Sequence, residues 1–227
     1  MILLHGAMGC TAEIEPLAAA FRHYTDVTAP NLLGHGGRPI PERLDIGAMA
    51  RDVVDQCDHA GIGRTFVAGY SLGATLALYL ARHFPDRFAG AIALAPKVVF
   101  DAQTVSHWTH LADPDRLRRN GRALAHEKNH APQDWVELTR VNIALFQELG
   151  EHPPLGDSDL AAIAIPVMIV SSDRDPLVPW DEAKAIAKGI AGSHLAMFYG
   201  ASHPLAAVPV HPIARTVSAW MDGARKR

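Results

Sequence analysis

The chain has 227 residues, of which 48% are hydrophobic and 20% are charged, and its formal net charge is −3. This length and apolar content are enough for one sizeable buried core. Nucleic-acid binding is not expected, because charges of both signs are interspersed and the longest basic cluster, at 116–119, is typical of a solvated helix face. The two cysteines, Cys10 and Cys57, provide no disulfide framework and favour a reducing compartment.

Targeting and membrane segments are not expected either. The first residues contain only a four-residue apolar run with no basic residue before it, which is unlike a signal peptide. No uninterrupted apolar stretch approaches the roughly 18 residues that span a bilayer. We therefore expect a cytoplasmic protein with no membrane partner.

Short apolar runs alternate with helical patterns along the chain, which is typical of a doubly wound α/β fold. The runs have little polar alternation, as expected for a mostly parallel sheet covered by helices on both faces. Helix ends are readable as well: Asp45 is a typical N-cap residue and Gly61 a typical stop signal. The expected strands are 1–4, 26–29, 65–68, 89–95, 166–171 and 194–199, and further helices are expected at 74–84, 181–190 and 212–221.

The segment 97–159 breaks this alternation and is interpreted as an inserted helical cap, with 1–96 and 160–227 forming the core. Asp113 followed by Pro114 predicts a helix start, with the helix running towards His126. A second helix is expected from about 133 to 149. Large apolar residues such as Trp108 are too many for a solvated insertion. Either all of them pack on the core, or some pack there and others, Trp108 among them, contact a substrate.

A Gly-x-Ser-x-Gly pattern follows the expected strand at 65–68 and precedes a helix. A serine hydroxyl that stands clear of a sheet needs a very sharp turn, and Gly69 and Gly73 remove the Cβ atoms that would clash there. Ser71 is therefore the candidate nucleophile. The Leu72 N–H, at the start of the next helix, is a candidate donor to an oxyanion.

The sequence at 126–130 also spells the zinc-protease pattern H-E-x-x-H. The chain contains 13 histidines, so chance matches come easily. Zinc binding would need a continuous helix and a third ligand, whereas Ala131 and Pro132 indicate that this helix ends. We expect no metal and no cofactor.

With these features the chain resembles the α/β-hydrolase family. Besides the serine turn, the match rests on His5-Gly6 directly after the first strand, on the loop at 30–37, and on acid and histidine segments near the C-terminus. The resemblance implies that the Ala7 N–H is the second oxyanion donor. The family's usual aspartate in the loop is Asn31 here, a position without a catalytic role.

The resemblance also implies the sheet topology. The family usually has two strands before His-Gly that are missing here, which leaves six strands in the order 2-1-3-4-5-6. Ligands in such sheets bind beyond the strand C-termini at the point where the order reverses, and Ala7 and Ser71 would flank that crevice. Met8, Tyr70 and Arg38 are further candidates for substrate contact.

The family's residue order of serine, acid and histidine limits the general base to His194, His203 or His211. His203 follows the last strand on the side where Ser71 lies, whereas His194 begins that strand at the opposite end of the sheet. Two carboxylates, Asp173 and Asp175, follow the fifth strand. The resemblance favours Asp175, because the family's acid typically precedes x-Leu/Ile-Val-Pro.

These residues predict a serine hydrolase that cleaves a small carboxylic ester through an acyl-enzyme on Ser71. Three alternatives stay open: a carbon–carbon hydrolase or lyase with the same residues, an acyltransferase, and a ligand receptor that retains them. The expected partner is a small-molecule substrate, and the expected state is a monomer or homodimer. The substrate itself does not follow from the fold.

Overall fold

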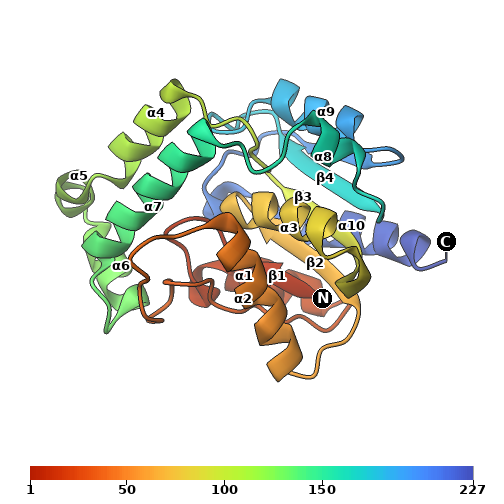
Figure 1. The fold of residues 1–227 in the computed structure, drawn as a ribbon, viewed down its shortest axis with the longest axis horizontal. Coiled ribbons are helices and arrows are strands. Elements are labelled where there is room, and N and C mark those ends of the chain that lie inside the picture. Colours follow the sequence, from red (N-terminus) through yellow and green to blue (C-terminus); the bar gives the residue numbers. More distant parts are fainter. Residues whose placement is uncertain (227) are drawn as a thin grey trace.

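The sheet of this protein consists of five parallel strands in the computed structural model, which describes residues 1–226 (Figure 1). Neighbouring strands along the chain are also neighbours in the sheet, in the order β1 to β5. The strands are β1 (Ile2–Leu4), β2 (Thr65–Tyr70), β3 (Phe88–Leu94), β4 (Val167–Ser172) and β5 (His194–Phe198). This is the predicted α/β class with a parallel sheet.

The prediction of a sixth strand at 26–29 was wrong in extent. This segment lies beside β1, where the predicted order placed it, but it forms only one parallel bridge, between Thr28 and Ile2. The Thr28 N–H donates to the Met1 carbonyl at 3.0 Å, and the Leu3 N–H donates to the Thr28 carbonyl at 2.9 Å. The pairing ends here because Pro30 has no N–H to continue it.

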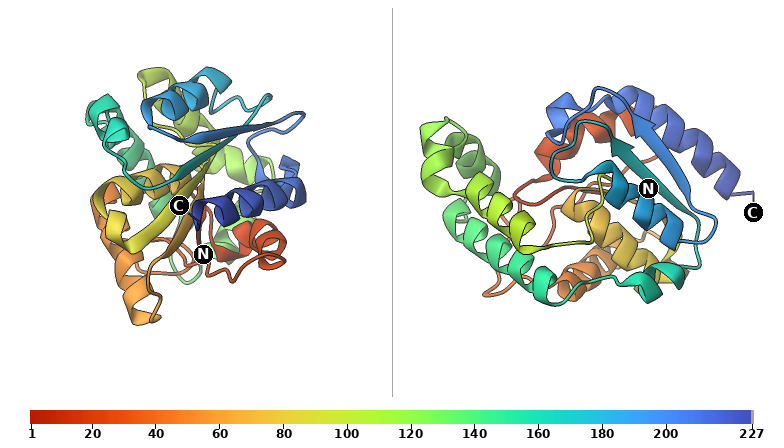
Figure 2. Two further views of the ribbon diagram at one scale, coloured as in Figure 1. Left: turned by 90° about the vertical axis from the view of Figure 1, so that its right-hand side faces the viewer. Right: turned by 90° about the horizontal axis from the view of Figure 1, so that it is seen from above.

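Helices cover both faces of the sheet, since alternate strand residues point to opposite sides. Ile2 and Leu4 belong to the core beneath one helix layer, whereas Leu3 belongs to the core on the other face. The two layers are visible in the side view in Figure 2. The first layer is formed by α2 (Ile46–His59), α3 (Leu72–His83) and α9 (Trp180–Gly189), and the second by α1 (Thr11–Arg22) and α10 (Val210–Ala224).

Core helices α2, α3, α9 and α10 agree with the predictions from the sequence, whereas α1 does not. Asp45 caps α2 as predicted, accepting a hydrogen bond from the Ala48 N–H at 2.7 Å. The predicted helices at 74–84, 181–190 and 212–221 correspond to α3, α9 and α10. Helix α1 was not predicted, since its N-cap side chain makes no capping bond and Pro16 lies within it. Short 3₁₀ turns occur at Pro85–Arg87 and Leu205–Ala207.

Residues 97–159, hereafter the insertion, connect β3 to β4 mainly through helices. Figure 2 shows the helices of residues 102–151 as a separate layer at one end of the molecule, whereas residues 157–161 lie beside α9. The expected helix from 114 to 126 is divided in two, because Gly121 adopts a φ of +75° that ends the first part. The helices of this connection are α4 (Ala102–Ala112), α5 (Pro114–Arg119), α6 (Ala123–His130), α7 (Trp135–Glu151) and α8 (Asp157–Ala161), which runs just past the insertion.

Candidate active site

Ser71 occupies a sharp turn between β2 and α3. Its backbone has φ +55° and ψ −120°, a conformation that residues other than glycine rarely adopt. Its N–H donates a hydrogen bond to the Leu94 carbonyl at 2.9 Å. A Cβ atom on Gly69 would lie 1.9 Å from the Gly73 carbonyl oxygen, and one on Gly73 would lie 2.5 Å from the His5 carbonyl oxygen. Glycine is therefore required on both sides of the serine, and the turn presents the hydroxyl at the C-terminal edge of the sheet.

His203 and Asp175 complete a chain of hydrogen bonds that begins at the serine. His203 Nε2 lies 3.0 Å from Ser71 Oγ, and His203 Nδ1 lies 2.7 Å from Asp175 Oδ2. The loops after β4 and β5 supply the carboxylate and the imidazole, so the ends of β2, β4 and β5 all contribute to one edge of the sheet. A carboxylate only accepts, so Nδ1 carries the proton and Nε2 is free to accept the serine proton.

The Asp175 carboxylate is buried, with only 1% of its side chain exposed. Its Oδ1 accepts hydrogen bonds from the Leu177 N–H at 2.8 Å and the Val178 N–H at 3.0 Å. Burial raises the pKa of Asp175, but the contact with His203 and the hydrogen bonds from these two amides together lower it by more. The net pKa therefore lies below the ordinary value. The group is therefore ionised at neutral pH and can stabilise a positive charge on His203.

Asp173, the alternative acid, has a different task. Its Oδ1 accepts a hydrogen bond from the Gly200 N–H at 2.6 Å, and its other oxygen lies 3.8 Å from Arg174. It thereby ties the loop after β4 to the end of β5. The geometry brings Asp175, and not Asp173, into hydrogen-bonding contact with His203.

The two backbone N–H groups named as oxyanion donors belong to residues that lie close to Ser71. Leu72 is the first residue of α3, where N–H groups have no partner within the helix. Ala7 lies in a tight turn after β1, in which the Gly9 N–H donates to the Gly6 carbonyl at 3.1 Å. Gly6 is adjacent to the nucleophile, since a Cβ there would lie 3.3 Å from the Ser71 Cβ. A negative oxygen placed between these amides would be stabilised by both.

Two hollows meet at Ser71 and share four of their lining residues. The larger has a volume of about 440 Å³ and extends beneath α4, and the smaller has about 260 Å³ and extends past the turn after β1. The residues common to both are Ser71, Trp108, Leu177 and His203. The larger hollow also contains the half-buried ion pair between Lys97 and Glu182, whose charged atoms are 2.7 Å apart. Together they provide room for a small molecule on both sides of the serine.

Of the four residues named as substrate contacts, three line the hollows and one does not. Met8 and Tyr70 line the smaller hollow, and Trp108 lines both. The Tyr70 ring lies 5.5 Å from the His203 ring, and burial raises the pKa of its hydroxyl, so it is neutral. The expectation for Arg38 is not supported: it lines neither hollow, because its guanidinium is bonded to Asp52 at 2.6 and 2.7 Å and to the Asn31 carbonyl.

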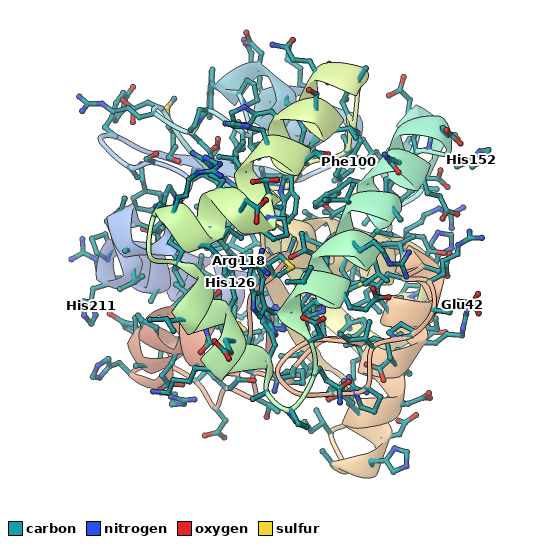
Figure 3. The ribbon with its side chains drawn as sticks, turned by 90° about the vertical axis from the view of Figure 1, so that its left-hand side faces the viewer. Glu42, Phe100, Arg118, His126, His152 and His211 are labelled. Atoms are coloured by element: carbon teal, nitrogen blue, oxygen red, sulfur yellow. The ribbon has the colours of Figure 1, made fainter. Side chains whose placement is uncertain are left out.

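The H-E-x-x-H sequence lies in α6, and the structure explains its second histidine without a metal. His130 is buried, and both of its ring nitrogens are hydrogen-bonded to backbone groups. The ring of His126 stacks on it with a centroid distance of 6.0 Å, and Figure 3 labels His126 on the short helices that precede α7. Within residues 1–226, no three His, Cys, Asp or Glu side chains gather in a way that could hold a metal ion. Over the same range, no helix has both the length and the apolar character that crossing a membrane would require.

The sequence profile described as "Alpha/beta hydrolase family" matches residues 1–219. The chain belongs to the α/β-hydrolase family. The family of hydrolases expected from the serine turn and the His-Gly sequence is thereby confirmed, and the parallel sheet agrees with it.

Individual relatives are similar at low identity. A thermostable monoacylglycerol lipase of Bacillus sp. is 27% identical, over 85% of this chain and 77% of the lipase. Lipase LipV of Mycobacterium tuberculosis is 36% identical, but the match covers 40% of this chain and 36% of LipV, so the chain spans only about a third of that relative. The crystal structure of an enol-lactonase from Burkholderia xenovorans superimposes with a TM-score of 0.77 at 18% identity, over 97% of this chain and 90% of that one. This last likeness concerns the fold alone.

Some groups at this site were not foreseen from the sequence of this α/β hydrolase. The amides of Leu177 and Val178 hold the Asp175 carboxylate, and His130 reaches the turn after β1 from the insertion. A signal for the first existed, since an aspartate followed by proline often accepts bonds from the amides that follow. No local pattern indicates the second, because His130 and its partner Met8 lie 122 residues apart.

Proposed function

We propose that this α/β hydrolase is a serine esterase that cleaves a small carboxylic ester through an acyl-enzyme on Ser71. The observation that carries the proposal is the unbroken hydrogen-bond chain from Ser71 Oγ through His203 to Asp175, at 3.0 and 2.7 Å. These distances permit proton transfer from the hydroxyl to the imidazole as the oxygen attacks a carbonyl carbon.

In the first half of the proposed reaction, Ser71 Oγ bonds to the carbonyl carbon while His203 Nε2 takes its proton. The carbonyl oxygen becomes negative and is stabilised by the Ala7 and Leu72 N–H groups, each contributing on the order of a 10²-fold rate increase. Asp175 stabilises the imidazolium. His203 then returns its proton to the alcohol oxygen as the ester bond breaks, which leaves an acyl group on Ser71.

In the second half, water replaces the alcohol. His203 takes a proton from the water, the hydroxide attacks the acyl carbon, and Ser71 leaves with the proton from His203. The products are a carboxylic acid and the regenerated enzyme.

We further propose that the insertion acts as a cap over the reacting groups. Val99, Phe100 and Trp108 belong to this segment and line the larger hollow together with Ser71. The two hollows are of a size for a small ester, and relatives named as lipases fit an ester substrate. The cap would then choose the groups on either side of the ester bond.

A fluorophosphonate label combined with p-nitrophenyl esters of graded acyl length tests this proposal. We expect the wild type to be labelled at Ser71 and to hydrolyse the esters, and we expect Ser71→Ala to remain folded and lose on the order of 10³-fold or more in kcat. Esterase activity that survives Ser71→Ala would refute the proposal. Turnover that depends on an added alcohol or thiol would instead indicate an acyltransferase.

A further inference from the structure

His130 connects the insertion to two loops of the core at once. It is the last residue of α6 and is fully buried. The Gly36 N–H donates to its Nδ1 at 3.1 Å, so the proton of the ring is on Nε2, which donates to the Met8 carbonyl at 3.1 Å. One neutral ring is thereby hydrogen-bonded to both the 30–37 loop and the turn after β1.

Two more buried histidines lie near this ring, and each of them also makes one hydrogen bond as a donor and one as an acceptor. The His5 and His35 rings lie 5.3 Å apart, and the His35 and His130 rings lie 6.1 Å apart. His5 accepts from the Leu32 N–H at 3.0 Å and donates to the Gly6 carbonyl at 2.8 Å. Burial lowers the pKa of His5 to about 3 and that of His35 to about 4, and it also lowers the pKa of His130. These rings are therefore neutral, each with one donor and one acceptor in fixed places.

The turn that they hold contains Ala7. His5 fixes the carbonyl of Gly6, which shares a peptide plane with the Ala7 N–H, and His130 fixes the carbonyl of Met8. Met8 has a φ of +55°, a conformation that costs a non-glycine residue on the order of 1–3 kcal/mol and persists only where its surroundings impose it. From the side of the insertion, the hydrogen bond from His130 holds the backbone at this residue.

We propose that His130 is a positioning residue, which aims the Ala7 N–H at the developing oxyanion by holding the Met8 carbonyl. This inference rests on the proposed esterase function and deepens it. It assigns to the insertion a part in transition-state stabilisation, in addition to any part in substrate choice. Loss of the hydrogen bond from His130 to the Met8 carbonyl should lower kcat and leave KM nearly unchanged, because an oxyanion donor acts on the transition state and not on the bound ester.

Two substitutions at this position separate its two hydrogen bonds. The amide nitrogen of glutamine can take the place of Nε2, so His130→Gln keeps a donor for the Met8 carbonyl and loses the Gly36 bond. The amide oxygen of asparagine takes the place of Nδ1, so His130→Asn keeps an acceptor for Gly36 and cannot reach Met8. Each variant loses one hydrogen bond, so a purely structural role would make them alike.

We expect kcat for a p-nitrophenyl ester to fall 10- to 100-fold in His130→Asn and to stay within about 3-fold of the wild type in His130→Gln, with KM changed by less than about 3-fold in both. His110→Asn is the control, since His110 is exposed on α4 and contacts neither hollow. Equal kcat values in the Asn and Gln variants would overturn the inference.

Folding of each variant is checked by circular dichroism and thermal melting. Should His130→Asn not fold, His130→Leu takes its place as a variant of similar volume without either bond, with the same loss in kcat expected. Should neither fold, His130→Gln decides alone, and a kcat more than tenfold below the wild type would overturn the inference. Ser71→Ala, measured with the same ester, shows separately whether the esterase proposal holds.

Discussion

The two aspartates after β4 offer a sharp comparison at the scale of single residues. Asp175 bonds to His203 at 2.7 Å, whereas Asp173 bonds to the Gly200 N–H. We expect Asp175→Asn to lower kcat by on the order of 10³-fold or more, because a neutral amide no longer holds the imidazole tautomer that accepts the serine proton. Asp173→Asn retains an oxygen for Gly200 and should stay within a few-fold of the wild type.

Steady-state kinetics of both variants with one p-nitrophenyl ester provide the measurement. A larger loss in Asp173→Asn than in Asp175→Asn would show that the acid is wrongly assigned, although Ser71 could still be the nucleophile.

The same pair shows how far the sequence leads at this scale. Two carboxylates on one loop are equally well placed in sequence, and resemblance to the family was needed to choose between them. The serine needed no such help, because Gly69 and Gly73 are required by local sterics alone. Arg38 was misjudged because its partner, Asp52, lies in another element and is invisible to a local pattern.

At the scale of elements, Trp108 on α4 is the side chain of the insertion that lies between the two hollows. Its ring lies 4.4 Å from the Phe146 ring of α7, yet it is only partly buried. We expect Trp108→Ala to shift preference towards bulkier esters with a small loss in melting temperature, because it removes part of the wall and little of the core.

Trp135→Ala is the matched control. Trp135 is 7% exposed and packs between Arg118 and His126, so its truncation should cost about 3–5 kcal/mol with little change in preference. A panel of acyl chain lengths together with chemical unfolding measures both effects. If the Trp108 variant loses as much stability as the control with selectivity unchanged, Trp108 belongs to the packing.

An element could be predicted from the sequence when its signals lie within its own residues. Helix α2 has a capping aspartate, a terminal glycine and a helical apolar face, and all three are local. Helix α4 went unforeseen although Asp101 caps it, because it is largely exposed and buries only Ala112. The segment 26–29 looked like a strand, but the extent of its pairing depended on β1, which has only three residues.

At the scale of the whole molecule, the buried histidines make stability depend on pH. The folded-state pKa values of His5 and His35 are lowered to about 3 and about 4, so below pH 6.5 the unfolded chain binds protons that the folded protein does not. Stability is therefore full above about pH 6.5 and falls as the pH drops towards the folded-state values. Each such histidine contributes a slope of about 1.4 kcal/mol per pH unit in this range.

Urea unfolding between pH 5 and 7.5 measures this slope, and His35→Gln isolates one contribution. Its amide can still meet Asn142, which bonds to His35 at 3.3 Å, but it does not titrate. We expect the variant to be less stable than the wild type at pH 7.5 and to have a slope smaller by about 1.4 kcal/mol per unit below pH 6.5. An unchanged slope would mean that His35 is protonated in the folded protein.

The path of the insertion has a consequence for engineering. The chain leaves the sheet at Leu94, beside Val170, and re-enters it at Val167, which pairs with Ala91 further down the same two strands. The segment is thus the crossover of a parallel strand pair, and some of its residues also line the larger hollow at Ser71. Its two ends do not meet, so it cannot be excised and closed with a short loop. A segment taken from a relative must include the counterparts of α7 and α8, which return the chain to the N-terminal end of β4. A shortened variant would need a new helix for the same purpose.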